Sequence, residues 1–496
     1  MKKLLLTLLL LSSLSFGIAK PAFIGVHASD DQFSPVRAFI QKQMLERQVP
    51  SVAVAVARDG KIIWEEAFGW ANREERIAAT PHTMYSLASI SKPITATGLM
   101  ILKERGKLDL DRPLNDYLGD AKIKVRLGNP ADLTVRRVAN HSSGLPLHYQ
   151  FFYEDEPFRA PARDETINRY ANTVTAPGEK YQYSNLGYGL LDYLIERGSG
   201  KSYAEFMRTE VFQPLGLTHM SVDIPAEMEK QQAVRYGTDG LPIPFYAFDH
   251  PGGSAIYASA HDLVRFGLFH LKARLADQKA ILSDQTIDEM HKATMTTGPN
   301  AGYGIGWASN TYPGNHLCVS HTGGMGGVAT SLRLFPKEKI AIAVLTNSSS
   351  PAPHQIADEI MATLMPDARP APATPNNATD TAFKPTDALI GTWEGTVHTY
   401  KTDLPFTLVF QPDGDIHAWI GTQHKSLVNR AEFKDGYLTG EFLGDIGTED
   451  ANRTRYVLAL SLKLRGNALN GAVTARSLPS KRLGNALTQW AELKKK

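Results

Sequence analysis

The sequence is nearly free of cysteine, because Cys318 is the only one in 496 residues. A single thiol excludes an internal disulfide. There is also no His-Glu-x-x-His pattern among the 15 histidines, so a dedicated zinc site is not expected. The chain lacks an excess of one charge as well, since 53 basic residues balance 51 acidic ones to a net charge of +2. This balance is not that of a nucleic-acid-binding protein. We therefore expect no metal, no cofactor and no nucleic-acid partner.

The sequence also lacks an apolar run long enough to cross a membrane. Two lysines at the N-terminus precede an apolar stretch from Leu4 to about Leu14, shorter than the roughly 20 residues that a spanning helix needs. Small residues follow up to Ala19, which is the pattern of a secretory signal peptide. We predict removal of residues 1–19, with no integral membrane span afterwards. An exported chain with so little cysteine favours a periplasmic or secreted bacterial protein.

Large apolar residues are scarce in one internal segment, from Pro366 to Asp387, which is rich in proline, alanine, asparagine and threonine. Such a composition cannot bury a core, so we predict an extended linker over residues 366–386. The linker divides the mature chain into a domain at residues 20–365 and a second domain at residues 387–496.

Helix and strand patterns alternate in the first domain. Helices are expected over residues 33–46, 91–105, 186–196 and 261–272. Strands are expected over residues 51–57, 61–70, 316–320, 329–335 and 340–346. Because strands at both ends of the domain flank the helices, we predict an α+β fold. One antiparallel sheet would combine both ends and be packed by helices.

Seven short β-type runs make up the second domain. They are expected over residues 393–397, 406–411, 416–420, 436–442, 455–464, 468–475 and 487–493. Turn patterns such as Pro412-Asp413-Gly414 separate them. Short strands at this spacing predict an up-and-down meander or a small all-β barrel, with Trp393 in its core.

Ser89 and Lys92 form the first pair of residues that could carry chemistry. If a helix begins at this point, residues three apart share a face, and the serine backbone N–H lies at the positive end of the helix. Pro93 supports that start, since proline is tolerated in a first turn. An alcohol needs a base to become a nucleophile, and an amine at this spacing can accept its proton. Roughly two Ser-x-x-Lys matches are expected by chance in a chain of this length, so the pair needs further support.

Tyr183 and Asn185 follow the Pro177-Gly178 turn and precede an apolar helix. A phenol at such a junction can act as an acid or a base when a nearby cation lowers its pKa. The asparagine amide can hold a substrate carbonyl or the lysine head. Tyr170-Ala171-Asn172 is a competing match, which its pattern places on the polar face of a helix.

The segment His321-Thr322-Gly323-Gly324 is the third element. A glycine-rich strand lets a substrate approach the backbone closely, and its N–H groups can donate to a developing oxyanion. The segment His250-Pro251-Gly252 looks alike, but proline removes a donor that such a strand needs. His321 is therefore the better candidate.

The order of these three elements resembles the serine β-lactamase-like and penicillin-binding-protein family. The branch is that of class C β-lactamases, D-alanyl-D-alanine carboxypeptidases, D-aminopeptidases and related esterases. The resemblance covers about residues 35–365. It includes flanking signatures at residues 106–110, 141–146, 177–179 and 303–307. The segment from Asp387 resembles the lipocalin-like barrel that some members carry.

The resemblance implies an acyl-enzyme mechanism. Ser89 would be the nucleophile, and Lys92 and Tyr183 would share its proton, although which of the two is the general base stays open. Substrate-binding residues would be Asn185, His321, Thr322 and Gly323. The backbone N–H groups of Ser89 and Gly324 would form the oxyanion hole.

His321 stands where many members have lysine, and the histidine form resembles the aminopeptidase and protease members. Histidine is mostly neutral near pH 7, unlike a lysine suited to a substrate carboxylate. Three functions therefore stay open. The first is a peptidase or esterase for small peptides, D-amino-acid derivatives or esters. The second is a β-lactamase or cell-wall carboxypeptidase, and the third is a non-catalytic acyl-binding sensor or scaffold. The barrel would cap the active-site mouth, build a homo-oligomer, or be tethered without a catalytic role.

Overall fold

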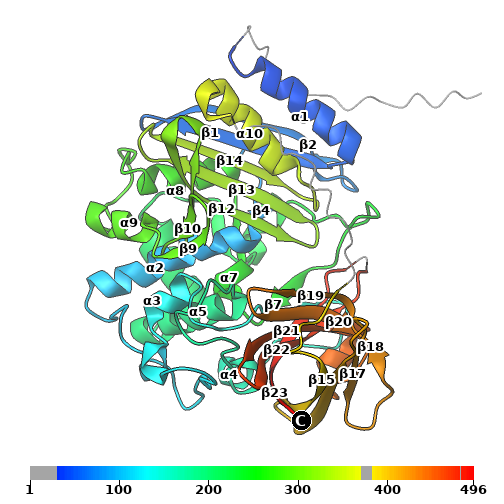
Figure 1. The fold of residues 1–496 in the computed structure, drawn as a ribbon. Coiled ribbons are helices and arrows are strands. Elements are labelled where there is room, and N and C mark those ends of the chain that lie inside the picture. Colours follow the sequence, from blue (N-terminus) through cyan, green and yellow to red (C-terminus); the bar gives the residue numbers. More distant parts are fainter. Residues whose placement is uncertain (1–30, 370–382, 481) are drawn as a thin grey trace, which may run out of the picture.

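The computed structural model describes residues 31–369, 383–480 and 482–496. The predicted signal peptide at residues 1–19 lies outside the described residues, as does most of the predicted linker. Residues 31–369 form an α+β part, and the described residues from 383 onward form an all-β part (Figure 1). No helix among the described residues is both long and apolar enough to span a bilayer.

In the described part of the chain, one antiparallel sheet of nine strands organises the larger part. Its order is β3-β2-β1-β14-β13-β12-β11-β10-β9, so β1 from the start of the domain pairs with β14 from its end. This confirms the α+β prediction. The strands are β1 Ser51–Arg58, β2 Lys61–Asn72, β3 Ile77–Ala78, β9 Met295–Gly298, β10 Ala301–Tyr303, β11 Ala308–Tyr312, β12 His316–Met325, β13 Val328–Phe335 and β14 Ile340–Thr346.

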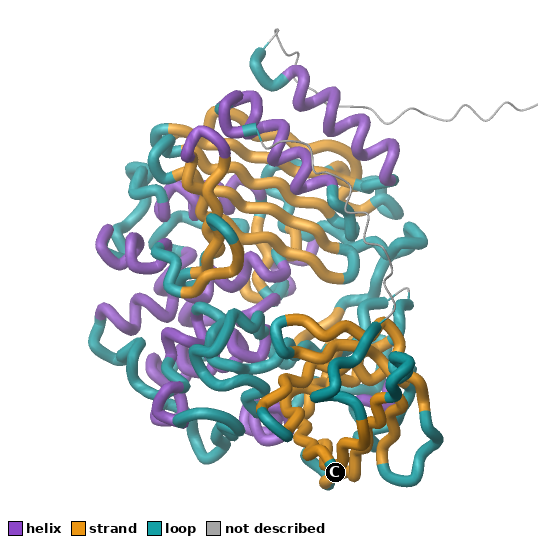
Figure 2. Tube along the Cα trace, in the orientation of Figure 1, coloured by secondary structure: helices purple, strands orange, loops and turns teal. Residues whose placement is uncertain are grey.

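Helices cover both faces of this sheet, and the sequence of β1 shows why. Its valines, such as Val54, face a core shared with α1 (Ser34–Arg47) and α10 (Ala352–Leu364). Its alanines, such as Ala55, face a second core that contains α8 (Ala260–His270). Successive side chains of a strand point to opposite faces, so the alternation of large and small residues assigns a helix layer to each face. Figure 2 shows the helices above and below the orange strands.

The site lies between the sheet and a group of helices below it. That group includes α2 (Ser91–Glu104), α5 (Asn185–Ser199) and the short α7 (Pro251–Ser254). Further helices are α3 Val135–Ala139, α4 Arg163–Tyr170, α6 Tyr203–Phe206 and α9 Asp284–His291. A small sheet of order β4-β8-β6 joins them, formed by β4 Tyr85–Ser86, β6 Met220–Val222 and β8 Ile256–Ala258. A separate pair consists of β5 Phe151–Tyr153 and β7 Tyr246–Phe248.

The C-terminal part is a near-closed antiparallel barrel, as predicted. Its strands are β15 Gly391–His398, β16 Asp403–Phe410, β17 Ile416–Ile420, β18 Ser426–Leu427, β19 Asn429–Lys434, β20 Tyr437–Phe442, β21 Tyr456–Arg465, β22 Ala468–Ser477 and β23 Ala486–Lys495. Strands that are neighbours in sequence pair with each other, except β18 and β19, and β23 pairs with β15. The outer strands β18 and β19 are separated only by Val428, which holds the two edges of the sheet near each other. Trp393 is fully buried inside, and its indole donates to the Leu389 carbonyl at 2.8 Å.

Candidate active site

Ser89 lies on a 3₁₀ turn, Ala88–Ile90, that leads directly into α2. The residue before it, Ala88, has a φ of +49°, a conformation that is uncommon for a residue with a side chain. Two contacts fix this turn through Leu87. Its N–H donates to the Ile256 carbonyl at 2.9 Å, and its own carbonyl accepts from Thr330 Oγ1 at 3.0 Å. The turn therefore holds Ser89 where the predicted helix begins.

Lys92 lies fully buried beneath Ser89, one turn further along. Its Nζ is 3.1 Å from Ser89 Oγ, 2.7 Å from Asn185 Oδ1 and 3.0 Å from the Gly253 carbonyl oxygen. All three partners are neutral, so no opposite charge offsets the burial of the amine. Burial therefore lowers the pKa of Lys92 well below its ordinary value. A buried amine of this kind can act as a base near neutral pH.

Tyr183 approaches Ser89 from the loop before α5. Its phenol is hydrogen-bonded to Ser89, and Lys92 Nζ lies 4.8 Å from its ring centroid. Burial raises the pKa of the Tyr183 phenol, and the hydrogen bond to Ser89 only partly opposes this rise. The Tyr183 phenol is therefore protonated near neutral pH, whereas burial drives Lys92 toward its neutral form. Of the two candidate bases, the surroundings favour Lys92.

An aromatic group surrounds Tyr183 and was not predicted as part of the site. The His141 ring lies 4.3 Å from the Tyr183 ring centroid and 4.8 Å from that of Tyr303. His141 Nδ1 accepts the Ser184 N–H at 3.2 Å, which ties the loop before α5 to residue 141. Two flanking signatures of the sequence, at residues 141–146 and 303–307, thus supply packing that fixes Tyr183. Their distance along the chain hid that role.

Strand β12 brings the glycine-rich segment against the turn of Ser89. Strand β11 pairs only with residues 316–320 of β12, so the edge from His321 to Met325 is free of that neighbour. A side chain at Gly323 would place its Cβ 2.0 Å from the Leu87 carbonyl oxygen. Only glycine permits this close approach, which agrees with the expected need for a bare backbone at this point.

His321 is buried, and both of its ring nitrogens have protein partners. Nε2 is 2.9 Å from the Tyr303 hydroxyl, and Nδ1 is 2.8 Å from the Thr322 carbonyl oxygen. Burial, with a smaller contribution from Lys92, lowers the pKa of His321 to about 3. His321 is therefore neutral across the physiological pH range. Thr322 is exposed and does not line the cavity described below, whereas Gly323 and Gly324 do.

Two segments resembled the site motifs in the sequence and were rejected as candidates, and the structure shows what each of them contacts. His250-Pro251-Gly252 forms the start of α7 rather than a strand, yet the Gly253 carbonyl of α7 holds Lys92. Tyr170 does not lie on a polar helix face, contrary to the prediction. It is fully buried, and its hydroxyl donates to the carboxylate of Asp450 in the barrel. Tertiary contacts with the second domain explain this residue.

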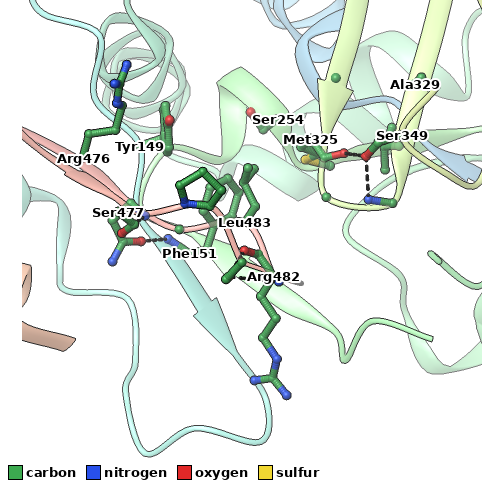
Figure 3. A pocket seen from close by; sticks show the side chains of 18 of the residues that line it. Tyr149, Phe151, Ser254, Met325, Ala329, Ser349, Arg476, Ser477, Arg482 and Leu483 are labelled. Carbon is green, nitrogen blue, oxygen red and sulfur yellow. Dashed lines mark hydrogen bonds between the residues drawn. The ribbon is translucent and has the colours of Figure 1, made fainter. Parts of the chain in front are cut away.

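Ser89 opens into a cavity of about 950 Å³ between the two domains. On the side of the first domain it is lined by Ser89, Tyr183, Asn185, Gly323 and Gly324, among others. On the other side it is lined by the barrel wall, which we define as Arg476, Ser477, Leu483 and Asn485, from the end of β22 to the residues just before β23. Figure 3 shows Arg476, Ser477 and Leu483 near Tyr149 and Phe151, apart from Met325. The barrel therefore forms part of the cavity that contains the candidate nucleophile.

Main-chain contacts join the barrel wall to the first domain. The Tyr149 N–H donates to the Ala486 carbonyl at 3.1 Å, and the Ala486 N–H donates back at 2.9 Å. Beside this pair, the Phe151 N–H donates to Asn485 Oδ1 at 2.9 Å (Figure 3). These bonds join the start of β23 and the residue before it to the start of β5 and the segment before it, so the wall has a fixed position.

Glu179 anchors the barrel on the same side of the molecule. Its carboxylate accepts from Lys463 at 2.5 Å, Arg465 at 2.7 Å and the Tyr437 hydroxyl at 3.0 Å, all from the barrel. Burial alone would raise the pKa of Glu179, but these donors and the Ala176 N–H lower it to about 2. The signature at residues 177–179 thus carries the charge that docks the barrel.

Comparisons with known proteins agree with this arrangement. Residues 36–364 match the family model described as Beta-lactamase. Penicillin-binding protein 4* of Bacillus subtilis (strain 168) is 26% identical over 341 residues, which are 61% of this chain and 69% of that protein. Protein flp of Staphylococcus aureus (strain NCTC 8325 / PS 47) is 25% identical over 336 residues, 65% of this chain. The matched region spans 64% of protein flp, just under two thirds of its length.

Solved structures share the fold. The octameric penicillin-binding protein homologue from Pyrococcus abyssi superposes with a TM-score of 0.60 at 24% identity, covering 93% of this chain and 99% of that chain. A class C beta-lactamase from Rhodobacter sphaeroides gives a TM-score of 0.55 at 24% identity, with 65% of this chain and 96% of that chain covered. The first likeness extends over the barrel as well, because it covers nearly the whole chain.

Proposed function

The chain belongs to the beta-lactamase family, and on this premise we propose that it is an exported serine hydrolase that works through an acyl-enzyme on Ser89. Its substrates would be small peptides, D-amino-acid derivatives or esters, cleaved at an amide or ester bond. The observation that carries the proposal is the 3.1 Å approach of a buried Lys92, without an opposite charge, to Ser89 Oγ beside the cavity.

Lys92 is the general base in this mechanism. A neutral amine has two N–H groups and one lone pair, and Asn185 and Gly253 accept the two N–H groups. The lone pair is then left for the Ser89 hydroxyl. As Ser89 Oγ bonds to the substrate carbonyl carbon, its proton passes to Lys92 Nζ, and the backbone N–H groups of Ser89 and Gly324 stabilise the oxyanion.

Tyr183 completes the proton path. Because its phenol is protonated at rest and hydrogen-bonded to Ser89, it can give its proton to the leaving nitrogen or oxygen. Lys92 then returns the proton taken from Ser89 to the phenolate. The acyl group remains on Ser89, and water activated by the same groups releases it.

The lining of the cavity supports a small substrate. The barrel wall faces Ser89 across a space of about 950 Å³, which suits a short peptide or ester rather than a folded protein. His321 brings no positive charge, since its pKa is about 3. A neutral residue at this position gives no preference for a substrate carboxylate, which favours peptide derivatives and esters over β-lactams.

The decisive test is intact-mass analysis of the purified chain and a Ser89→Ala variant after incubation with a fluorophosphonate probe. We expect one probe mass on the wild type and none on the variant. Absence of labelling in folded wild-type protein would contradict the proposal and favour a non-catalytic acyl-binding sensor or scaffold.

A β-lactamase or D-alanyl-D-alanine carboxypeptidase is the second candidate, favoured by the family match and by relatives that are named penicillin-binding proteins. Turnover of nitrocefin is compared with that of p-nitrophenyl esters and D-amino-acid amides. We expect the esters and amides to be the better substrates. We also expect His321→Lys to improve nitrocefin turnover about tenfold, since it adds a cation for the lactam carboxylate. Fast nitrocefin turnover with His321 intact would make the second candidate the correct one.

Export and self-association are also proposed. The basic and apolar N-terminus supports cleavage after Ala19, and N-terminal sequencing of the secreted protein tests it.

The Pyrococcus abyssi homologue is described as octameric, and its likeness covers this chain almost entirely, which supports assembly of this chain into a homo-oligomer. Light scattering on the purified chain measures its mass. A monomer at all concentrations would contradict assembly.

A further inference from the structure

Three histidines gather at one end of the small β4-β8-β6 sheet. Strand β8 is antiparallel to both β4 and β6, so the starts of β4 and β6 lie at the same end as the finish of β8. His82 precedes β4, His219 precedes β6, and His261 follows β8 at the start of α8. The topology of the sheet therefore brings together three imidazoles that are far apart in the sequence.

Glu65 of β2 joins His82 and His261 in a set of three possible ligands, and His219 lies beside His82 as a candidate for a fourth. His261 Nδ1 is 2.7 Å from Glu65 Oε2. The His82 ring centroid lies 4.6 Å from that of His261 and 5.1 Å from that of His219. One ligand atom from each of Glu65, His82 and His261 lies within 4.8 Å of the others. Ligands on a tetrahedral zinc ion, bonded at 2.0–2.1 Å, are roughly 3.4 Å apart, so shifts of about 1.5 Å in the ligand atoms of Glu65, His82 and His261 would suffice. His219 lies outside this set, and its Nδ1 is 3.1 Å from Thr218 Oγ1, so its ring would have to turn to become the fourth ligand.

The main chain already holds the three histidine-bearing segments together. The His261 N–H donates to the Pro81 carbonyl at 3.2 Å, beside His82. The Ser259 N–H donates to the His219 carbonyl at 3.0 Å, and the buried carboxylate of Asp262 accepts the His219 N–H at 2.5 Å. A ligand set that is fixed before binding loses little conformational entropy when an ion arrives.

We propose that Glu65, His82, His219 and His261 bind a divalent transition-metal ion, with Zn²⁺ as the best fit. Three imidazoles and one carboxylate form a donor set that zinc accepts in tetrahedral geometry. The sequence predicted no metal because it has no His-x-x-x-His spacing or cysteine pair. The four ligands come from separate elements that only the fold assembles.

The ion would tie together the strands that carry the catalytic groups. At its far end β4 leads to Ser86, three residues before Ser89. The far end of β8 begins at Ile256, three residues after Gly253, whose carbonyl accepts from Lys92. The metal has no place in the chemical step. It would hold β4 and β8 in position without contacting Ser89, so metal binding and the reactivity of Ser89 can be measured independently.

The test uses the full chain purified without a polyhistidine tag, treated with a chelator and titrated with Zn²⁺ in a calorimeter. We expect one ion per chain, and an affinity lowered at least about tenfold by His82→Ala, because one of four ligands is lost. His82 is exposed, so this variant should keep its fold, which circular dichroism checks. His261→Ala is the second variant. His424→Ala, which removes an exposed histidine of the barrel, is the matched control and should bind like the wild type.

Crystals soaked in Zn²⁺ locate the ion by its anomalous scattering. A peak between Glu65 and His261 supports the proposal. Lack of stoichiometric binding, unchanged affinity in folded His82→Ala, or a peak only elsewhere would overturn it. Fluorophosphonate labelling of the same samples reports on Ser89, so a failure of the metal site is distinguishable from a failure of the proposed hydrolase.

Discussion

The surroundings of two charged residues differ between the candidate site and the contact with the barrel. At the candidate site, Lys92 is buried among neutral partners, and its pKa falls. On the barrel side of the molecule, Glu179 is partly buried among cationic partners, and its pKa falls to about 2 because those partners favour its charged form. A buried amine without a counter-ion, such as Lys92, can lose its charge and act as a base. A carboxylate with cationic partners, such as Glu179, stays charged near neutral pH and can hold two domains together. The comparison separates a reactive group from a structural one without reference to their sequence motifs.

Lys92→Arg should have the largest effect. An arginine stays protonated even when buried, so the variant keeps the positive charge but cannot accept the Ser89 proton. We expect kcat/KM for a p-nitrophenyl ester to fall by at least about 10³-fold. Lys103→Arg on the same helix is the control, since Lys103 is paired with Glu289 and should tolerate the change. Activity above a tenth of the wild type would contradict Lys92 as the base.

Tyr183→Phe removes one hydroxyl and keeps the ring that packs on His141. We expect kcat to fall by about 10²–10⁴-fold with little change in KM, since the phenol acts on the leaving group. Tyr181→Phe removes a phenol two residues away and should leave kcat near the wild-type value. Equal losses in both variants would indicate a packing effect instead of proton transfer.

Glu179→Gln tests the anchor of the barrel. The variant loses the charge that Lys463 and Arg465 contact, and we expect the free energy of barrel docking to fall by about 1.5 kcal/mol. Because the folded pKa of Glu179 lies below the ordinary 4.5, its contribution is complete above that pH. It is lost as the pH falls toward about 2. Small-angle scattering and limited proteolysis between pH 6 and pH 3 measure the release of the barrel. A pH response that is the same in the variant would show that another group controls docking.

Arg482→Ala should have the smallest effect. Arg482 pairs with Asp155 across the same two domains, but both side chains are more exposed than those of Glu179 and its partners, at 37% and 44%. Exposed ion pairs are screened by water and salt, so we expect the proteolysis pattern to match that of the wild type. Release of the barrel by Arg482→Ala but not by Glu179→Gln would show that the Arg482–Asp155 pair, and not Glu179, anchors the barrel.

Much of the fold followed from periodicity in the sequence. The alternation of valine and alanine in β1 and the apolar faces of α2, α5 and α8 placed these elements within a few residues of their observed bounds. Strands β9, β10, β11, β18 and β19 were not predicted. They are short, and most of their side chains are exposed or only partly buried, so they carry little hydrophobic pattern. They are strands because their backbones are hydrogen-bonded to neighbouring strands.

The candidate nucleophile and its partner were accessible from sequence because a helix fixes residues three apart on one face. Gly253 was not, since a backbone carbonyl that accepts from Lys92 has no sequence signature. Nor was the part played by Tyr303, whose hydroxyl is 2.9 Å from His321 Nε2. Such contacts depend on the packing of elements that are remote along the chain.

The sequence by itself determined the local chemistry: Ser89 beside Lys92, Tyr183 before a helix, and a bare glycine strand after His321. It also determined two domains, since periodicity and composition are local properties. Only the tertiary structure decided that Lys92 has neutral partners and no counter-ion among the described residues, that His321 is buried and neutral, and that the barrel wall faces Ser89. The burial of a group and the charges near it depend on segments that are distant in the sequence and meet only in the fold, so no short stretch of sequence can predict them.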